Sequence, residues 1–322
     1  MSSYDQDNPP PQQGGSRKGR LFIALLIALF ALISYWSQTQ VNPVTGEKQH
    51  LTITPDQEIR LGLESAPEMS REMGGELPSS DPRTQIVQKM GQKLVQGTEA
   101  LKSPWEFKFH LLADPQTVNA FALPGGQVFI TLGLFNQLQT EAQLAGVLGH
   151  EMGHVIERHS AQQMAKSQFG NLLVVAVGTA ASSGEQTGRG GAMAIAAFVN
   201  QMLQLRYSRG DESEADKWGV HLMEEVGYTP VAMIEVMDIL KNASGKGREG
   251  VPEMFQTHPN PDLRSQQIKE ILEKNPPKPG LTEGRNLHSL YSGEQIQNTS
   301  DDNGNDLERL LENLFHVQPD AR

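Results

Sequence analysis

The most regular pattern of apolar and polar positions lies between Thr140 and Ser160. Apolar residues recur there at intervals of three and four: Leu144, Val147, Leu148, Met152 and Val155. Such spacing places them in one stripe along a helix. Thr140 followed by Gln143 is typical of a capping box, in which the two residues satisfy each other's backbone groups at a helix start. The pattern therefore predicts a helix over 140–160 that continues towards Phe169.

The other elements are predicted in the same way, because alternation of apolar and polar residues favours a strand and three- or four-residue spacing favours a helix. Strands are expected over 105–112, 118–123 and 127–131, with a turn at 124–126. Helices are expected over 55–72, 81–101, 211–226, 230–240 and 261–272. The sequence thus predicts an α+β fold that is mainly helical, with a small sheet beside the helix of residues 140–160.

The N-terminal part of the chain has the pattern of a membrane anchor. Residues 1–20 are rich in Pro, Gln, Gly and Ser, which predicts a disordered segment. Residues 21–36 carry no charge, and a helix of that length spans roughly 24 Å, so we expect a transmembrane signal anchor over 21–37. A cleavable signal peptide is the alternative, but no small-residue cleavage site follows. The basic residues before the apolar run predict a cytoplasmic N-terminus and an extracytoplasmic remainder.

The rest of the chain divides by composition. Residues 38–80 read as a spacer with an N-terminal helix, 81–275 as the main domain, and 276–322 as a mostly flexible tail with one short amphipathic helix over 307–315. Two apolar patches within 171–202 are each shorter than the roughly 17 residues that a spanning helix needs. Buried or membrane-skimming helices are predicted there, with a membrane-dipping hairpin as the alternative.

Composition then excludes several kinds of site. The net charge is −11 and no block of the folded part is dominated by Lys and Arg, which argues against a nucleic-acid partner. The 322 residues include no cysteine. Disulfides and zinc-thiolate sites are therefore excluded, and His, Asp and Glu are left as the strong metal ligands.

The predicted helix of residues 140–160 carries an H-E-x-x-H motif at His150, Glu151 and His154. Four residues make just over one turn, so both imidazoles can reach one metal ion, for which zinc is the first candidate. Glu151 flanks that position without having to bind the ion, which suits a general base towards water. The alternative is that the five-residue pattern arises by chance and that its histidines are surface or satisfied core residues.

A catalytic zinc needs a third protein ligand. The subclass with a third histidine six residues after His154 is excluded, because position 160 is Ser160 and His159 lies one place out of phase. A carboxylate from a later helix is the remaining choice. Glu212 and Asp216 are four residues apart and share a helix face, so one can bind the metal while the other hydrogen-bonds a ligand histidine.

The same acidic segment has a plain alternative interpretation. Glu214 is expected to point away from the face shared by its neighbours at 212 and 216. A solvated acidic first turn that balances a helix dipole is common, and without the upstream motif it would be the better interpretation.

Three separated motifs together resemble metallopeptidase family forty-eight, a gluzincin-type group of zinc proteases. They are the H-E-x-x-H sequence, the run Asn119-Ala120-Phe121-Ala122-Leu123-Pro124-Gly125-Gly126, and Tyr207-Ser208-Arg209 ahead of Glu212 and Asp216. The resemblance covers residues 55–273. It implies a zincin-like endopeptidase with one zinc ion, which His150, His154 and Glu212 bind, with Glu151 as the base and Asp216 behind the ligands.

The family resemblance extends to His258, which precedes Pro259, and to Arg264. In some periplasmic members a histidine at this place fills the open zinc position and keeps the enzyme latent; a loop histidine without that role is the alternative. Tyr207, Arg264 and His258 are candidate donors to the oxyanion of the reaction. This chain departs from the family branches that carry several spanning helices, a lipidated cysteine or C-terminal helical repeats, so their partners are not carried over.

The predicted function is that of a single-pass protease in a bacterial inner membrane with its catalytic domain on the periplasmic side. Residues 119–123 are expected to form an edge strand to which extended segments of unfolded or damaged proteins add as a further strand. Two other functions stay open, an anchored chaperone or assembly factor with a latent or structural zinc site, and a processing enzyme for one partner. The sequence does not predict the oligomeric state.

Overall fold

The structure is a computed structural model that describes residues 17–37, 39–167, 191–245, 254 and 257–292. Contacts divide the chain into two units, one of residues 1–40, 48–52 and 162–188 and a larger one of residues 41–47, 53–161 and 189–322. Several predictions fall outside the described residues, namely those for residues 1–16, for the first apolar patch over 172–181 and for the helix over 307–315.

Helix α1 (Arg17–Ser37) forms where the anchor is predicted. Large apolar side chains are exposed along it, among them Leu25 at 65% and Phe30 at 67%. Within the described residues, no helix is long and apolar enough to cross a membrane. Two short strands, β1 (Thr39–Val41) and β2 (Lys48–His50), follow and pair with each other.

A three-stranded sheet forms the centre of the larger unit. It consists of β3 (Lys108–Leu112), β4 (Ala120–Leu123) and β5 (Gln127–Thr131), in the order β3-β5-β4. β5 pairs in parallel with β3 and antiparallel with β4, and all five of its residues are buried. The turn between β4 and β5 requires glycine, because a Cβ on Gly125 would lie 2.4 Å from the Cα of Ile59 in α2.

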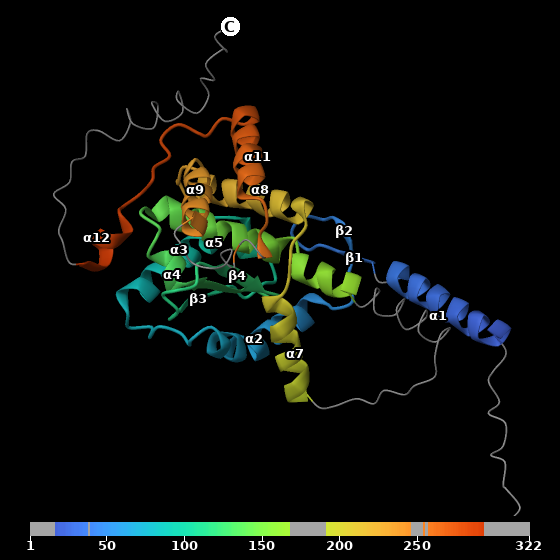
Figure 1. The fold of residues 1–322 in the computed structure, drawn as a ribbon. Coiled ribbons are helices and arrows are strands. Elements are labelled where there is room, and N and C mark those ends of the chain that lie inside the picture. The colour runs from blue at the N-terminus through green and yellow to red at the C-terminus, as the bar shows by residue number, and fades with distance from the viewer. Residues whose placement is uncertain (1–16, 38, 168–190, 246–253, 255–256, 293–322) are drawn as a thin grey trace, which may run out of the picture. The chain divides into compact units, whose positions relative to one another are not determined.

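Helices make up most of the remaining described chain (Figure 1). Their bounds are α2 Pro55–Glu72, α3 Pro82–Gln96, a 3-10 turn Glu99–Lys102, α4 Leu132–Phe135, α5 Glu141–Ile156, α7 Gly191–Leu203, α8 Arg209–Glu225, α9 Ala232–Gly245, α11 Pro261–Lys274 and α12 Leu287–Ser292. The prediction of a mainly helical α+β fold is confirmed. The strands and helices predicted within the described residues are present, most with ends that differ by one to five residues, although the helix over 140–160 is interrupted.

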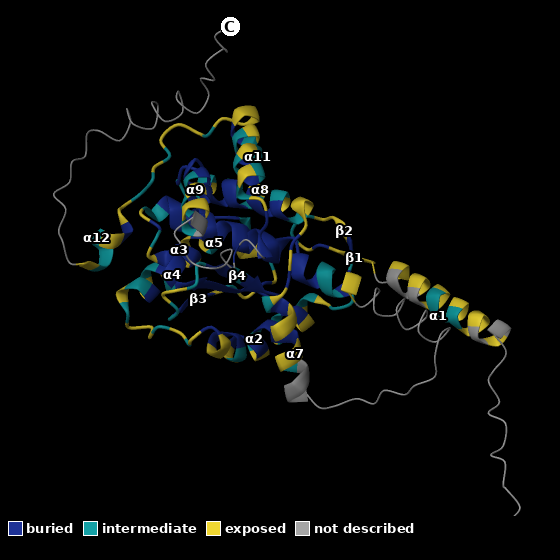
Figure 2. Ribbon diagram, viewed as in Figure 1, coloured by how far each residue is buried: buried dark blue, intermediate teal, exposed yellow. Residues whose placement is uncertain are grey.

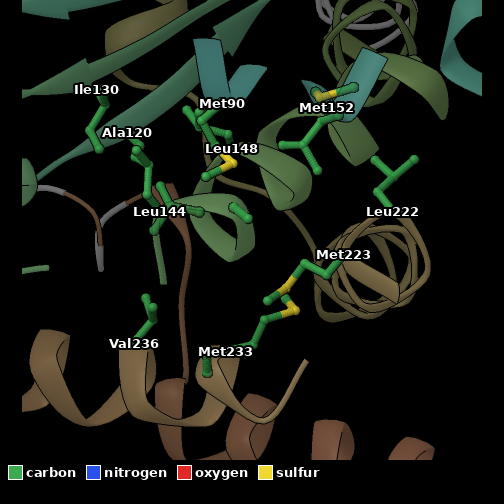
Figure 3. Packing of buried hydrophobic residues seen from close by; sticks show 14 of the residues in the cluster. Met90, Ala120, Ile130, Leu144, Leu148, Met152, Leu222, Met223, Met233 and Val236 are labelled. Carbon is green, nitrogen blue, oxygen red and sulfur yellow. The ribbon is translucent and has the colours of Figure 1, made fainter. Parts of the chain in front are cut away.

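The core is organised around α5. Figure 3 shows its Leu144, Leu148 and Met152 among side chains from the sheet, α8 and α9. Every residue of α5 after the first is buried, and the helix is dark blue in Figure 2. A helix buried on all sides holds its side chains in fixed positions, which is what a site built on it needs.

The single helix predicted over 140–160 is interrupted. α5 ends at Ile156, a turn occupies residues 157–158, and residues 159–167 are helical again. Arg158 has a φ of 60°, in the left-handed region that ends a helix. Its fully buried guanidinium donates to Glu58 of α2 from Nε at 2.8 Å and also from Nη2. This buried ion pair stabilises the turn at the expense of a continuous helix.

The tail predicted to be flexible from residue 276 is structured as far as residue 292. Its backbone covers the first turn of α5, because the N–H groups of Glu141 and Ala142 donate to the carbonyls of Arg285 and Glu283 at 3.0 and 2.9 Å. Arg285 also forms an ion pair of 2.8 Å with Glu141, and Leu287 is buried. The N–H groups at a helix start have no partner within the helix, so this segment supplies the acceptors.

Candidate metal centre

Helix α5 presents the two histidines of the motif on one face. The Thr140 hydroxyl caps the helix, as predicted, by accepting from the N–H of Gln143 at 3.2 Å. The reciprocal half of the predicted capping box is not formed, because Oε1 of Gln143 accepts from the N–H of Gln139 at 2.7 Å instead. One turn from its C-terminal end, the Nε2 atoms of His150 and His154 lie 3.1 Å apart, and their rings meet edge to face. Both side chains are buried.

Helix α8 brings its acidic face against these histidines. The Glu212 carboxylate lies 3.5 Å from Nε2 of His150 and 3.6 Å from Nε2 of His154. Asp216, one turn further, lies 2.9 Å from the other nitrogen of His150, Nδ1. Glu212 and Asp216 are buried, whereas the side chain of Glu214 is 47% exposed. The predicted division of these carboxylates between two faces of the helix is therefore found in the structure.

The two helices can meet so closely because glycine stands at the contact. A Cβ on Gly153 would lie 2.9 Å from both Cα and O of Ala215. Real Cβ contacts of this length essentially never occur between backbones, so a larger residue would push α8 away from α5. The contact sets the distance between the histidine pair and Glu212.

His258 joins the cluster from the segment before α11. Its Nδ1 lies 3.0 Å from Glu212 Oε1 and 3.3 Å from His150 Nε2. The ligand atoms of His150, His154, Glu212 and His258 all lie within 4.8 Å of one another, and all four residues are buried. The sequence predicts a regulatory or oxyanion role for His258, and the structure places this residue among the other ligand atoms of the site.

Arg264 of α11 compensates the two buried carboxylates. Its Nε and Nη2 donate to Asp216 at 3.0 and 2.6 Å, and Nη1 lies 3.0 Å from Glu212. Burial alone would raise the pKa of each carboxyl. Instead, the charge of Arg264 lowers the pKa of Asp216, and the charges of His258 and Arg264 hold that of Glu212 well below its usual range.

Burial also shifts the pKa values within the motif. It raises the pKa of Glu151, and together with neighbouring His150 it lowers that of His154. Burial and the charge of Arg264 act to lower the pKa of His150, but hydrogen bonds with Asp216 and Glu212 raise it to about 9.

The donor set fits a zinc ion. Three imidazoles and a carboxylate are ligands that zinc accepts in proteins. Both carboxylate oxygens of Glu151 and Nε2 of His258 are buried without a hydrogen-bond partner in the described part of the chain, and Oε1 of Glu151 lies 3.7 Å from this Nε2. Unpaired polar atoms are costly in a protein interior, so a cluster of them around one point indicates a site for an ion and water.

Two further residues contact His154. The Tyr207 ring stacks on it with centroids 3.8 Å apart, while the Tyr207 hydroxyl lies 3.0 Å from Oγ of Ser160. The Nδ1 atoms of His159 and His154 lie 2.8 Å apart. The sequence predicts no role for His159, because this residue lies one place out of phase with the third histidine of the longer zinc motif. The left-handed Arg158 that breaks the helix cannot be read from the spacing of apolar residues.

The predicted edge strand is at the edge of the sheet. β4 pairs only with β5 among the described strands, in a register that opposes Phe121 to Phe129. Ala120, Ala122 and Leu123 are buried, and Phe121 is partly exposed. Asn119 is buried with its side-chain oxygen unpaired in the described structure. β4 also contacts α5, so this edge lies beside the helix that carries the motif.

The chain is similar to a known family over most of the larger unit. The sequence model of "Peptidase family M48" matches residues 81–272. The chain belongs to peptidase family M48. This is the family numbered forty-eight that the motifs resemble, so the predicted family is confirmed.

Relatives occur in bacteria and in mitochondria. A beta-barrel assembly-enhancing protease of Yersinia pestis is 31% identical over 249 residues, which are 74% of this chain and 48% of that protein. Its counterpart in Escherichia coli strain K12 is 29% identical over 80% of this chain and 54% of that protein. The mitochondrial metalloendopeptidase OMA1 of Schizosaccharomyces pombe is 30% identical over 74% of this chain and 68% of that protein. The chain thus spans about half the length of the two bacterial relatives.

Proposed function

We propose that the chain hydrolyses peptide bonds with a zinc ion held by His150, His154 and Glu212, and with Glu151 as general base. One observation carries this proposal. The carboxylate of Glu212 on α8 converges on the histidine pair of α5, and the carboxylate of Glu151, which accepts no hydrogen bond from the described residues, is buried beside them. A zinc site that is only structural has no use for this fourth group.

Each residue has a defined task in this reaction. When bound, zinc supplies Lewis-acid activation of water and of the scissile carbonyl. Glu151 takes the proton of the attacking water and returns it to the leaving amine, and its raised pKa makes the carboxyl a stronger base. Asp216 accepts from Nδ1 of His150 and so keeps the Nε2 lone pair free for the metal.

The test compares casein degradation by the wild type and Glu151→Gln, each with and without a zinc chelator. The substitution removes the base but keeps the shape of the side chain, so we expect proteolysis to fall by about 10²–10⁴-fold with zinc content unchanged. The chelator abolishes wild-type activity, and added zinc restores it. Equal activity in all samples would reject the enzyme in favour of an anchored chaperone or assembly factor.

For His258 we propose a latch. Its Nδ1 lies among the ligand atoms, where it occupies space that a substrate carbonyl needs. His258→Ala then increases casein degradation. If His258 instead donates to the oxyanion, the same variant lowers degradation, because Tyr207 and Arg264 are already hydrogen-bonded to Ser160 and Asp216. The direction of the change separates the two roles.

Extended segments of unfolded or damaged proteins are the proposed substrates. A strand at a sheet edge can pair with a peptide backbone regardless of its sequence, and β4 runs beside α5. Mass spectrometry of the proteins trapped on Glu151→Gln tests whether the substrates are many different unfolded proteins. Recovery of one protein alone would favour a processing enzyme over quality control.

We also propose that α1 attaches the chain to a bacterial inner membrane, with the site on the periplasmic side. The exposed apolar side chains of α1 support attachment, since a surface of this kind is stable only when covered. The full chain is then expected to stay with the membrane pellet after carbonate extraction, and a chain without residues 17–37 to be released. Release of both would refute the attachment.

A further inference from the structure

A hydrogen-bonded path leads from His154 to the protein surface. His154 Nδ1 lies 2.8 Å from Nδ1 of His159, and Nε2 of His159 lies 3.1 Å from Oε2 of Glu214. The His159 side chain is fully buried, whereas that of Glu214 is 47% exposed. The path therefore begins at a buried ligand residue and ends at a carboxylate that contacts solvent.

Only one arrangement of protons satisfies this path together with a metal on Nε2. A neutral imidazole carries one N–H, so His154 must carry it on Nδ1 when the Nε2 lone pair is to bind an ion. Nδ1 of His159 then accepts that hydrogen bond. The proton of His159 is consequently on Nε2, from which it is donated to the carboxylate of Glu214.

The backbone break after α5 makes this contact possible. On a continuous helix a residue five positions on lies roughly 140° around the axis, which turns it away from His154. The left-handed conformation of Arg158 interrupts the helix directly before His159. The Arg158 guanidinium, held by Glu58 and by the carbonyl of Ile53 at 3.1 Å, keeps this turn in place.

The two histidines of the motif are thus supported differently. Asp216, which is buried and forms an ion pair with Arg264, accepts a hydrogen bond directly from Nδ1 of His150. We infer that His159 and Glu214 form the corresponding positioning relay for His154, which fixes its tautomer and ring orientation for zinc. This inference rests on the proposed zinc site and assigns a task to two residues outside the ligand set.

The test measures zinc affinity of the full chain by competition with a chelator of known affinity. Loss of an outer hydrogen-bond partner typically weakens metal binding about 10- to 100-fold, and we expect such a loss for His159→Phe, which keeps ring size but accepts no hydrogen bond. His159→Asn keeps an acceptor near the position of Nδ1 and should recover part of the affinity. Glu214→Ala, at a partly exposed position, should weaken binding less than His159→Phe.

Two controls distinguish a change in the orientation of the His154 ring from a loss of folding stability. Glu225→Gln removes an exposed carboxylate at the other end of α8 and should leave zinc affinity unchanged. Thermal unfolding of the zinc-free forms should be the same for Glu214→Ala and the wild type, because a relay acts on the metal-binding histidine and not on packing. A drop in zinc-free melting temperature with unaltered zinc affinity would show a structural role only.

Zinc affinities of His159→Phe and Glu214→Ala within about twofold of the wild type would overturn the relay, since the loss of an outer hydrogen-bond partner has a larger effect. This outcome differs from failure of the proposed function. In that case the wild type itself would bind no zinc, or Glu151→Gln would degrade casein as fast as the wild type.

Discussion

Helices α5 and α8 supply the proposed ligands, yet they are buried in different ways. α5 is enclosed on all sides, and its neighbours outside the site are mainly apolar side chains from the sheet, α8 and α9. α8 is buried on one face only, and this face includes the carboxylates of Glu212 and Asp216. Outside the site, apolar packing suffices to bury α5, whereas α8 also needs an opposite charge, which Arg264 provides.

This difference determines where the site is vulnerable. In α5 a substitution acts through volume, because apolar interiors are closely packed. In α8 it acts through charge, because a buried carboxylate without a partner is unstable. Substitutions at Arg264, at the contact between the helices and at the end of α5 should therefore have effects of decreasing size.

The largest effect is expected for Arg264→Ala. This variant leaves Asp216 and Glu212 buried without their cation, and breaking a buried ion pair in this way typically costs about 3–5 kcal/mol. Urea unfolding of the zinc-free protein measures the loss. Arg71→Ala, which removes an exposed pair with Glu68, should change the free energy of unfolding by less than about 1 kcal/mol. Equal effects of both variants would mean that α8 does not depend on charge compensation.

An intermediate effect is expected for Gly153→Ala. The added methyl would lie 2.9 Å from backbone atoms of Ala215, which cannot move away without shifting α8, so we expect a loss of about 1–3 kcal/mol. Gly210→Ala in the first turn of α8 is the matched control, because the nearest atom to its methyl is Ser208 Oγ at 3.6 Å. That variant should be neutral or more stable by about 0.5–1 kcal/mol. Thermal unfolding of the two variants measures the difference. A higher melting temperature for both would contradict the close contact between Gly153 and Ala215.

The smallest effect is expected for Glu157→Gln, at the end of α5. Glu157 accepts a 2.6 Å hydrogen bond from Trp218 of α8, and burial raises its pKa. The folded protein therefore holds this proton more tightly, and the resulting stability is present below the usual pKa of glutamate and is lost as the pH rises through the raised value. The glutamine side chain of the variant keeps an acceptor but does not ionise.

The stability of Glu157→Gln should accordingly fall less than that of the wild type between pH 4 and pH 8, by under about 1 kcal/mol. Urea unfolding at both pH values measures this difference. Glu225→Gln, which removes an exposed carboxylate of α8, is the control for the loss of one negative charge. An identical pH dependence of the wild type and Glu157→Gln would exclude a shifted carboxyl at this contact.

The same contrast explains what the sequence predicts. The apolar period of α5 and the alternation over residues 105–112, which contain β3, are local patterns, so the positions of these elements follow from neighbouring residues. The face shared by Glu212 and Asp216 also follows from helical geometry. The positions of His258 and Arg264 inside the cluster depend on how α11 folds back over α8, and the sequence provided them only through a resemblance.

Two features had no local pattern at all. Left-handed Arg158 looks like an ordinary surface arginine in the sequence, because its partner Glu58 is a hundred residues away. The segment around Arg285 has the composition of a flexible tail, yet it supplies acceptors to the start of α5. Long-range contacts of single polar residues cannot be inferred from periodicity, which detects only continuous buried faces.

The contact of Glu283 and Arg285 with the start of α5 has a practical consequence for anyone who shortens this chain. The region that matches the peptidase family ends at residue 272, so a fragment cut there would be a natural choice for expression. Such a fragment would leave the amide groups of Glu141 and Ala142 without their carbonyl acceptors, at the first turn of the histidine-bearing helix. A minimal catalytic fragment should therefore extend through Ser292.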